Sequence, residues 1–376
     1  MIRSAARGAA LFTKEGCALR SWKFWLGVLI SAVFVWLTAR GLHWDEFVAA
    51  LRGARYGWLL PAAGIYFVAV LARTWRWHYM LRHMKPIRVR RLFPIVVIGY
   101  MGNNVFPARA GEVIRSYVLR KKEGVPISAS LATVALERLF DGLVMCAFVF
   151  LTLPFVPLPR LYQNIVILAS ALFFVALIIF LLLVANPARA ESIAARVVSF
   201  FTPLRFRDRA VRLAAKFLVG LHALRSPRDL LMITVASAAV WLTETSTYWI
   251  VAQAFPALDV SFVALMLMTA VVNLATMIPS APGYVGTFDK PGIEALKAFG
   301  QPANLAAAFT IVLHVTLWLP ITLLGFLFMA RESLHWRELE SATQDREAGE
   351  QGSRGIREQR APVKDCRELT AAKPKP

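Results

Sequence analysis

The sequence predicts an all-α, polytopic transmembrane bundle with about 8 hydrophobic segments, several of which exceed the roughly 18 residues that mark a membrane-spanning helix. Hydrophobic residues make up 57% of the 376 residues, whereas a soluble globular chain averages about 45–50%. They gather in long runs, and an unbroken run such as 165–184 excludes the alternating pattern of a barrel strand. The runs lie at 22–39, 58–72, 143–153, 165–184, 230–255, 262–278 and 306–330.

Three domains are expected along the chain. Residues 1–20 form a basic N-terminus, and the apolar run after it has no small-residue cleavage site, so it is expected to be a retained first helix. Residues 21–335 form the transmembrane domain. Residues 336–376 are charged and contain Gly and Pro, which is typical of a disordered tail.

The formal net charge of +20 has two interpretations. In a soluble protein it would suggest nucleic-acid binding, but basic residues also collect in the cytoplasmic loops of membrane proteins. The second interpretation fits the basic loops 73–91, 107–127 and 186–228. We therefore expect no nucleic-acid partner, both termini in the cytoplasm, and 186–228 along the inner membrane face.

Residues 92–106 do not fit a simple span. Both flanking loops are basic, and a helix of about 15 residues reaches about 22 Å, short of the roughly 30 Å hydrocarbon core. The segment also contains Pro94, Gly99 and Gly102. These features predict a re-entrant segment that enters and leaves on the cytoplasmic side.

Residues 261–300 predict a second broken segment, which begins and ends outside. It contains Pro279, Pro282, Gly283 and Gly286. The sequence thus predicts about six crossings and two broken hairpins of opposite orientation, the pattern of transporters built from inverted repeats with a site near the midplane. The alternative is that both segments are ordinary kinked helices.

Glu137, Arg138 and Asp141 lie in an otherwise apolar helix, where each charge costs about 2.5–3.5 kcal/mol on insertion scales. Glu137 and Asp141 share one helix face. Two roles stay open for this cluster. The acids could anchor Arg109 and Arg115 in a buried ion-pair network. Alternatively, Arg109, Arg115 and Arg138 could bind a headgroup phosphate, with the acids and Glu112 positioning them.

Other polar positions carry weaker signals. Glu244 stands in a polar band of Thr, Ser and Tyr that indicates a cavity wall, and His314 is expected to be a hydrogen-bonded interior residue. The three cysteines form no CxxC and the six histidines no HExxH, so neither a metal nor a cofactor is expected. The chain has no GxSxG and no GxxxxGK[ST], and no enzymatic role is predicted.

These motifs resemble those of the lysylphosphatidylglycerol synthase transmembrane-domain family over about residues 20–330. The matching residues are Asn104-x-x-Pro107-x-Arg109-x-Gly111-Glu112-x-x-Arg115, Glu137-Arg138-x-x-Asp141 and Pro279-x-x-Pro282-Gly283-x-x-Gly286. The family often has Pro-Gly-Gly-x-Gly and then an acid in the last motif, where this chain has Tyr284 and Thr287. Full-length synthases add a soluble aminoacyl-transfer domain, so the resemblance implies the translocation half alone.

The resemblance implies a flippase-like membrane protein, and the leading hypothesis is a lipid transporter of a bacterial-type inner membrane. Its alternating access could be coupled to protons through Glu112, Glu137 and Asp141. Its expected substrates are anionic phospholipids, polyprenyl-phosphate carriers or hopanoid-type lipids. The alternatives are a membrane-embedded enzyme or accessory subunit in lipid or envelope-polysaccharide synthesis, and a scaffold for an envelope-biosynthesis enzyme. The expected substrate-binding residues are Asn104, Arg109, Glu112, Arg115, Glu137, Arg138, Asp141, Pro282, Gly283 and Gly286.

Overall fold

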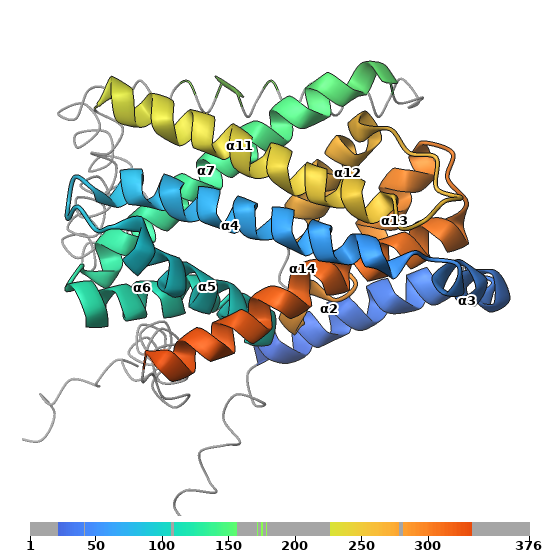
Figure 1. Ribbon diagram of the computed structural model, residues 1–376, viewed down its shortest axis with the longest axis horizontal. Coiled ribbons are helices and arrows are strands. Elements are labelled where there is room, and N and C mark those ends of the chain that lie inside the picture. The colour runs from blue at the N-terminus through green and yellow to red at the C-terminus, as the bar shows by residue number, and fades with distance from the viewer. Residues whose placement is uncertain are drawn as a thin grey trace, which may run out of the picture. The chain divides into compact units, whose positions relative to one another are not determined.

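The computed structural model describes residues 22–40, 42–106, 109–155, 226–277 and 281–332, with the single positions 171, 174, 175 and 178. Every element in these ranges is helical, so the predicted all-α bundle is confirmed (Figure 1). Several predictions fall outside the described residues. These are the N-terminus 1–20, most of the run 165–184, the basic stretch 186–225, the tail 336–376, and the two prolines Pro107 and Pro279.

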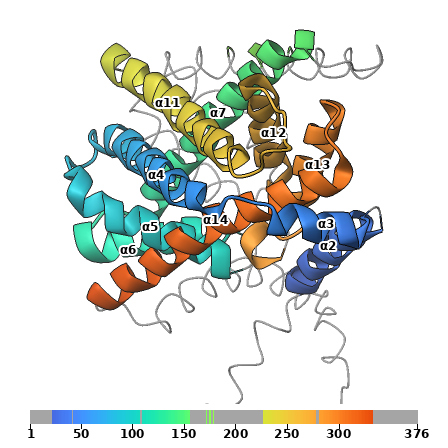
Figure 2. The same ribbon diagram turned by 45° about the vertical axis from the view of Figure 1, so that its right-hand side comes forward.

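One helical unit occurs twice in the chain: a long helix, a hairpin of two shorter helices, and a second long helix. The first copy consists of α4 (Leu59–Leu81), α5 (Val89–Val105), α6 (Gly111–Glu123) and α7 (Ile127–Thr152). The second consists of α11 (Pro227–Ala252), α12 (Phe262–Ala275), α13 (Asp289–Ala298) and α14 (Ala303–Arg331). Helices α4 and α11 pack side by side along their length (Figures 1 and 2).

Three described helices are long and apolar enough to cross a membrane: Tyr56–Leu81, Arg228–Ala252 and Ala303–Arg331. On α14 the exposed apolar side chains follow one another at about one-turn spacing, which makes a lipid-facing stripe. The stripe consists of Ile311, Val315, Leu319, Leu323, Phe326 and Leu327. Before these units come α2 (Trp22–Ala39) and the short helix α3 (Trp44–Arg52).

The two hairpins enter the bundle from opposite ends. Helix α14 has 29 residues and is therefore about 43 Å long. Its first residue follows the base of the α12–α13 hairpin, and at its far end Glu332 pairs with Lys122 of α6. Lys85 and Glu123, 2.8 Å apart, close the base of the α5–α6 hairpin at that same far end. The hairpin tips consequently meet between the two ends.

Local sequence sets where these helices begin and end. Ser226 caps α11 by accepting a hydrogen bond from the Asp229 amide at 3.3 Å, and Ser261 caps α12 in the same way from Ala264 at 3.2 Å. Helix α6 ends at Gly124, whose φ of +73° gives the left-handed C-cap that glycine accepts without strain.

The first hairpin is larger than the predicted segment 92–106. It runs from Val89 to Glu123, because most of the expected loop 107–127 forms α6. Its two helices approach closely at Gly111, where a Cβ atom would overlap the carbonyl oxygen of Gly99. The glycines therefore allow a second helix where the basic residues suggested a loop. The second hairpin occupies residues 262–298, close to the predicted range.

One further boundary was predicted wrongly. Helix α4 continues to Leu81, so Arg73 and Arg76 are buried helical residues and do not belong to a basic loop. The helix continues because apolar residues and Trp surround these arginines and buried acids on other helices neutralise them.

Candidate functional site

The two hairpin tips touch each other at a pair of strained residues. Arg109 in the first tip has a φ of +57°, and Tyr284 in the second has a φ of +60°. Such backbone costs about 1–3 kcal/mol per non-glycine residue and gathers at functional sites. The Arg109 guanidinium carbon lies 5.9 Å from the centre of the Tyr284 ring, and Nη1 donates a 3.4 Å hydrogen bond to the Thr276 carbonyl. Opposite halves of the chain therefore build one contact.

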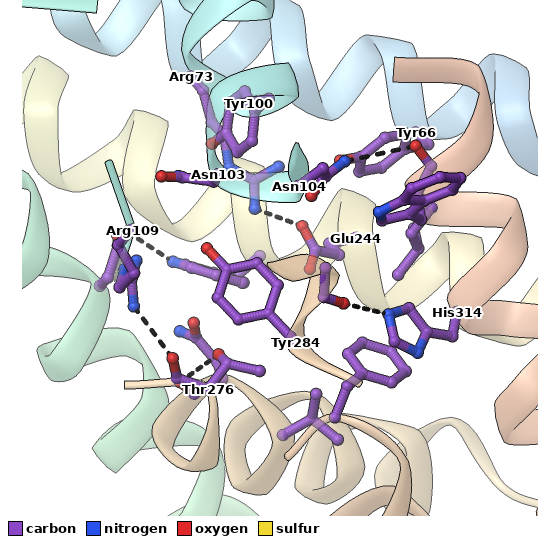
Figure 3. Close-up of a pocket in the computed structure, with 18 of the residues that line it drawn as sticks. Tyr66, Arg73, Tyr100, Asn103, Asn104, Arg109, Glu244, Thr276, Tyr284 and His314 are labelled. Carbon is purple, nitrogen blue, oxygen red and sulfur yellow. Dashed lines mark hydrogen bonds and ion pairs between the residues drawn. The ribbon is translucent and has the colours of Figure 1, made fainter. Parts of the chain in front are cut away.

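A polar cavity of about 130 Å³ lies at this contact. Tyr284 stands near its middle, with Arg109 on one side and Glu244 and His314 on the other (Figure 3). Helices from both units supply the walls, so the cavity exists only when the two halves are together. The polar lining residues include Tyr66, Arg73, Tyr100, Asn103, Asn104, Arg109, Arg138, Asp141, Glu244, Asn273, Thr276, Tyr284 and His314.

Arg76 of α4 is the centre of the buried charge network behind the cavity. Its side chain is 0% exposed, and its guanidinium lies 2.8 Å from Glu137 and 2.6 Å from Asp141 on α7. It also donates to the Ser237 hydroxyl of α11 at 3.0 Å. Charge-assisted hydrogen bonds to two carboxylates offset part of the desolvation of the buried charges. Arg76 thus holds three long helices at one point.

Two arginines of the first unit complete the network around the same acids. Arg115 of α6 pairs with Glu137, and its guanidinium lies 4.8 Å from the centre of the Trp77 ring. Arg138 lies 3.4 Å from Asp141 and 3.7 Å from Glu112. The predicted anchoring of Arg115 by Glu137 is confirmed. Arg109 was also expected to pair with Glu137 or Asp141, but its acidic partner is Glu112 at 3.3 Å.

Arg73 and Glu244 pair across the α4–α11 contact and face the cavity. The Arg73 guanidinium also lies 4.9 Å from the centre of the Trp241 ring. Two buried donors on this side, Nη1 of Arg73 and Nε of Arg138, have no hydrogen-bond partner within the described residues. A buried donor without a partner is costly, and donors of this type are suited to an anionic ligand.

Among the described residues the charges of this network do not balance. Five arginines meet four carboxylates, so one positive charge remains in excess when every group is ionised. A positive charge in excess in a partly buried network favours recruitment of an anion. The members are Arg73, Arg76, Arg109, Arg115, Arg138, Glu112, Glu137, Asp141 and Glu244.

His314 of α14 fixes the second tip. Its Nδ1 lies 2.8 Å from an Asp289 carboxylate oxygen, and its Nε2 lies 2.7 Å from the Gly283 carbonyl oxygen. Both neighbours are acceptors, so the ring satisfies both only when both nitrogens carry protons. Phe288 stacks on the ring with 4.4 Å between centres. The prediction of a hydrogen-bonded interior histidine is confirmed.

The ten residues predicted as substrate contacts separate into groups. Asn104, Arg109, Arg138, Asp141 and Gly283 line the polar cavity. Glu112, Arg115 and Glu137 lie behind it in the ion-pair network. The remaining pair is in the second tip: Pro282 lines a neighbouring apolar cavity, and Gly286 packs against Ser31 and Phe34 of α2.

Sequence reasoning missed Arg73 and Arg76 as members of the site, although it identified Glu244 as a cavity-wall residue. Both arginines stand within an apolar and aromatic stretch at i, i+3 spacing, on one helix face. Glu137, Asp141 and Glu244 lie in apolar segments, and buried acids require cationic partners. This requirement is the sequence signal that could have identified the two arginines. Tyr66, Tyr100 and Tyr284 carry no comparable signal, because tyrosines are common at membrane interfaces.

Comparison with known proteins places the chain in a family. Residues 24–325 match the family described as "Lysylphosphatidylglycerol synthase TM region". A "UPF0104 membrane protein" of Methanothermobacter thermautotrophicus is 25% identical over 312 residues, which cover 80% of this chain and 90% of that protein. Another of Methanocaldococcus jannaschii is 21% identical over 316 residues, covering 80% and 93%.

A third similar protein is named "Glycosyltransferase AglD" and comes from Haloferax volcanii. It is 25% identical over 331 residues, which cover 80% of this chain but only 52% of that protein. The family match extends over both helical units and both hairpin tips. The chain is therefore an integral membrane protein that belongs to the lysylphosphatidylglycerol synthase TM region family.

Proposed function

We propose that this protein moves an anionic lipid across the membrane, as a flippase-like transporter. The observation that carries the proposal is the cationic cavity between the tips of two hairpins that enter from opposite ends. Such a cavity can open to one side and then to the other while the site itself stays near the middle of the membrane. The excess positive charge of the network supports an anionic headgroup as the ligand.

Arg109 is proposed as the first contact of the headgroup phosphate. Its present partners are weak ones, the Thr276 carbonyl at 3.4 Å and Glu112 at 3.3 Å. A phosphate offers a charge-assisted, bidentate alternative. Arg73 and Arg138 supply further donors to the same cavity, while Arg76 and Arg115 hold the acids Glu137 and Asp141.

The orientation proposed for the protein follows from its charged end. The base of the first hairpin carries many basic residues, and the C-terminal end of α14 lies beside it. Basic loops favour the cytoplasmic side, which supports an inner-membrane protein with both termini in the cytoplasm. The basic residues at this end are Lys85, Arg88, Arg90, Arg91, Arg120, Lys121 and Lys122.

The proposal is tested with the full chain in sealed vesicles that contain fluorescent phosphatidylglycerol. A membrane-impermeant quencher reports how fast the labelled lipid changes leaflet. We expect wild-type protein to accelerate this movement, and Arg109→Ala to slow it by about 10- to 100-fold. That range corresponds to losing a hydrogen bond to a charged group, about 1.5–3 kcal/mol.

The matched control is Arg120→Ala, which removes an exposed arginine from the same helical hairpin and should leave the rate unchanged. Labelled phosphatidylcholine, whose headgroup is zwitterionic, should move more slowly than phosphatidylglycerol in wild-type vesicles. Equal rates for Arg109→Ala and wild type would overturn the proposed role of the cavity.

A second candidate function rests on the relative named as a glycosyltransferase. The chain covers only 52% of that protein, and this candidate is a membrane-embedded enzyme of lipid or envelope-polysaccharide synthesis. Purified chain incubated with membrane lipids and sugar donors discriminates the two proposals. Covalent turnover of lipid would favour an enzyme, whereas leaflet exchange without turnover favours the transporter.

A further inference from the structure

A second cavity lies beside the polar one and differs from it in character. Its volume is about 490 Å³, and its walls come from α2, α3, the first half of α14 and the second hairpin tip. Apolar side chains make most of this lining. Among them are Val35, Leu42, Trp44, Phe47, Ile311 and Val315.

The two cavities share one wall. Gly283, His314 and Trp318 line both of them. Gly283 and Trp318 pack tightly in this wall, because a Cβ atom on Gly283 would come within 2.8 Å of the Trp318 indole nitrogen. The polar and the apolar compartment therefore adjoin at these three residues.

The apolar cavity reaches the surface that faces lipid. Val315 is 51% exposed and belongs to the apolar stripe of α14, and Trp44 is 60% exposed at the start of α3. A hydrocarbon chain can enter from the bilayer without passing through water, because the lining and the bilayer interior are both apolar.

We infer that the apolar cavity takes a hydrocarbon chain of the same lipid whose anionic headgroup occupies the polar cavity. This inference rests on the proposed function and specifies its substrate. One ligand must match a cationic compartment and an adjoining apolar one, and a membrane lipid has both properties. A free anion would use only the polar cavity.

The two cavities also differ in volume. The polar cavity has about 130 Å³ and the apolar cavity about 490 Å³. The larger space is thus the apolar one, as a ligand with an anionic headgroup and a longer apolar part requires. The substrate class we infer is therefore a lipid with an anionic headgroup and at least one long chain.

The test uses the full chain in nanodiscs that contain phosphatidylglycerol with a photoreactive diazirine in one acyl chain. After irradiation, mass spectrometry of peptides maps where the chain was attached. We expect adducts on α3 and on residues 311–318 of α14. Adducts spread evenly over the exposed apolar surfaces of α11 and α14 would overturn the inference.

Val315→Trp fills the cavity and supplies the second measurement. We expect it to reduce the yield of adducts at this site at least tenfold, with a melting temperature close to that of wild type. The matched control is Leu323→Trp, two turns along the same helix, 60% exposed and outside the lining. An adduct yield in Val315→Trp equal to that of the wild-type protein would contradict the binding of a hydrocarbon chain in the apolar cavity.

Arg109→Ala distinguishes failure of this inference from failure of the proposed function. If Arg109→Ala abolishes movement of the lipid while Val315→Trp labels and transports like wild type, the headgroup site stands and the chain site is wrong. If Arg109→Ala transports normally, the proposed function fails. The apolar cavity then cannot be the site for the hydrocarbon chain of a lipid bound in the polar cavity.

Discussion

At the residue scale, Arg76 lies at the centre of the buried ion-pair network. Its pairs with Glu137 and Asp141 are buried, and its hydrogen bond to Ser237 reaches a third helix. Removing one member of a buried ion pair leaves the other uncompensated. Removal of the Arg76 side chain would therefore destabilise the protein, because Glu137 and Asp141 would stay buried without this counter-charge.

This environment predicts a large effect of Arg76→Met. We expect a loss of about 3–5 kcal/mol, the usual effect of breaking a buried pair, measured as a lower melting temperature in detergent micelles. Arg88→Met is the control, because Arg88 is exposed and such surface changes usually stay within about 0.5 kcal/mol. Equal melting temperatures for the two variants would contradict the network.

The contact between His314 and Asp289 predicts thermodynamic coupling. In a double-mutant cycle with His314→Gln and Asp289→Asn, we expect the two effects on stability to be non-additive by about 0.5–3 kcal/mol. The physical reason is the 2.8 Å contact, which each single change already removes. Additive effects would show that the ring and the carboxylate act independently.

At the element scale, the hairpins depend on close helix packing. Gly111 sits where α6 meets α5, and a side chain there would collide with the Gly99 carbonyl oxygen and with Asn103. Gly64 of α4 is the opposite case, with open space where its Cβ atom would be. The two positions offer the same substitution in two environments.

Gly111→Ala should consequently destabilise the protein strongly, because backbone cannot yield as a flexible side chain does. Gly64→Ala should be neutral or stabilising by up to about 1 kcal/mol, since alanine is the better helix former. Melting curves of the two purified variants check both expectations. A tolerated Gly111→Ala would mean that α5 and α6 do not pack as described.

The elements could be predicted from the sequence only in part. Apolar runs identified the spans, and the Gly- and Pro-rich stretches identified the hairpins. The end of α4 was missed because loop prediction treats clustered arginines as surface residues. That rule fails at Arg73 and Arg76, where acids from α7 and α11 neutralise the charge. Partners so distant in sequence are visible only after folding.

At the scale of the whole molecule, the two units are arranged so that neither contains a complete site. The first supplies Arg73, Arg109 and Arg138, and the second supplies Glu244, Tyr284 and His314. The sequence identified Arg109 and Arg138 of the first unit and Glu244 of the second as candidates, but it missed Arg73 and could not show which side chains of the two units face each other. Their meeting depends on packing between helices more than 100 positions apart, such as α4 and α11.

The most direct test of the central claim is an experimental structure in nanodiscs rich in phosphatidylglycerol. We predict density for a phosphate group beside Arg73, Arg109 and Arg138 in the polar cavity, with density for a hydrocarbon chain in the adjoining apolar cavity. Headgroup density confined to the outer surface of the bundle, with the space between the hairpin tips closed to lipid, would contradict the account.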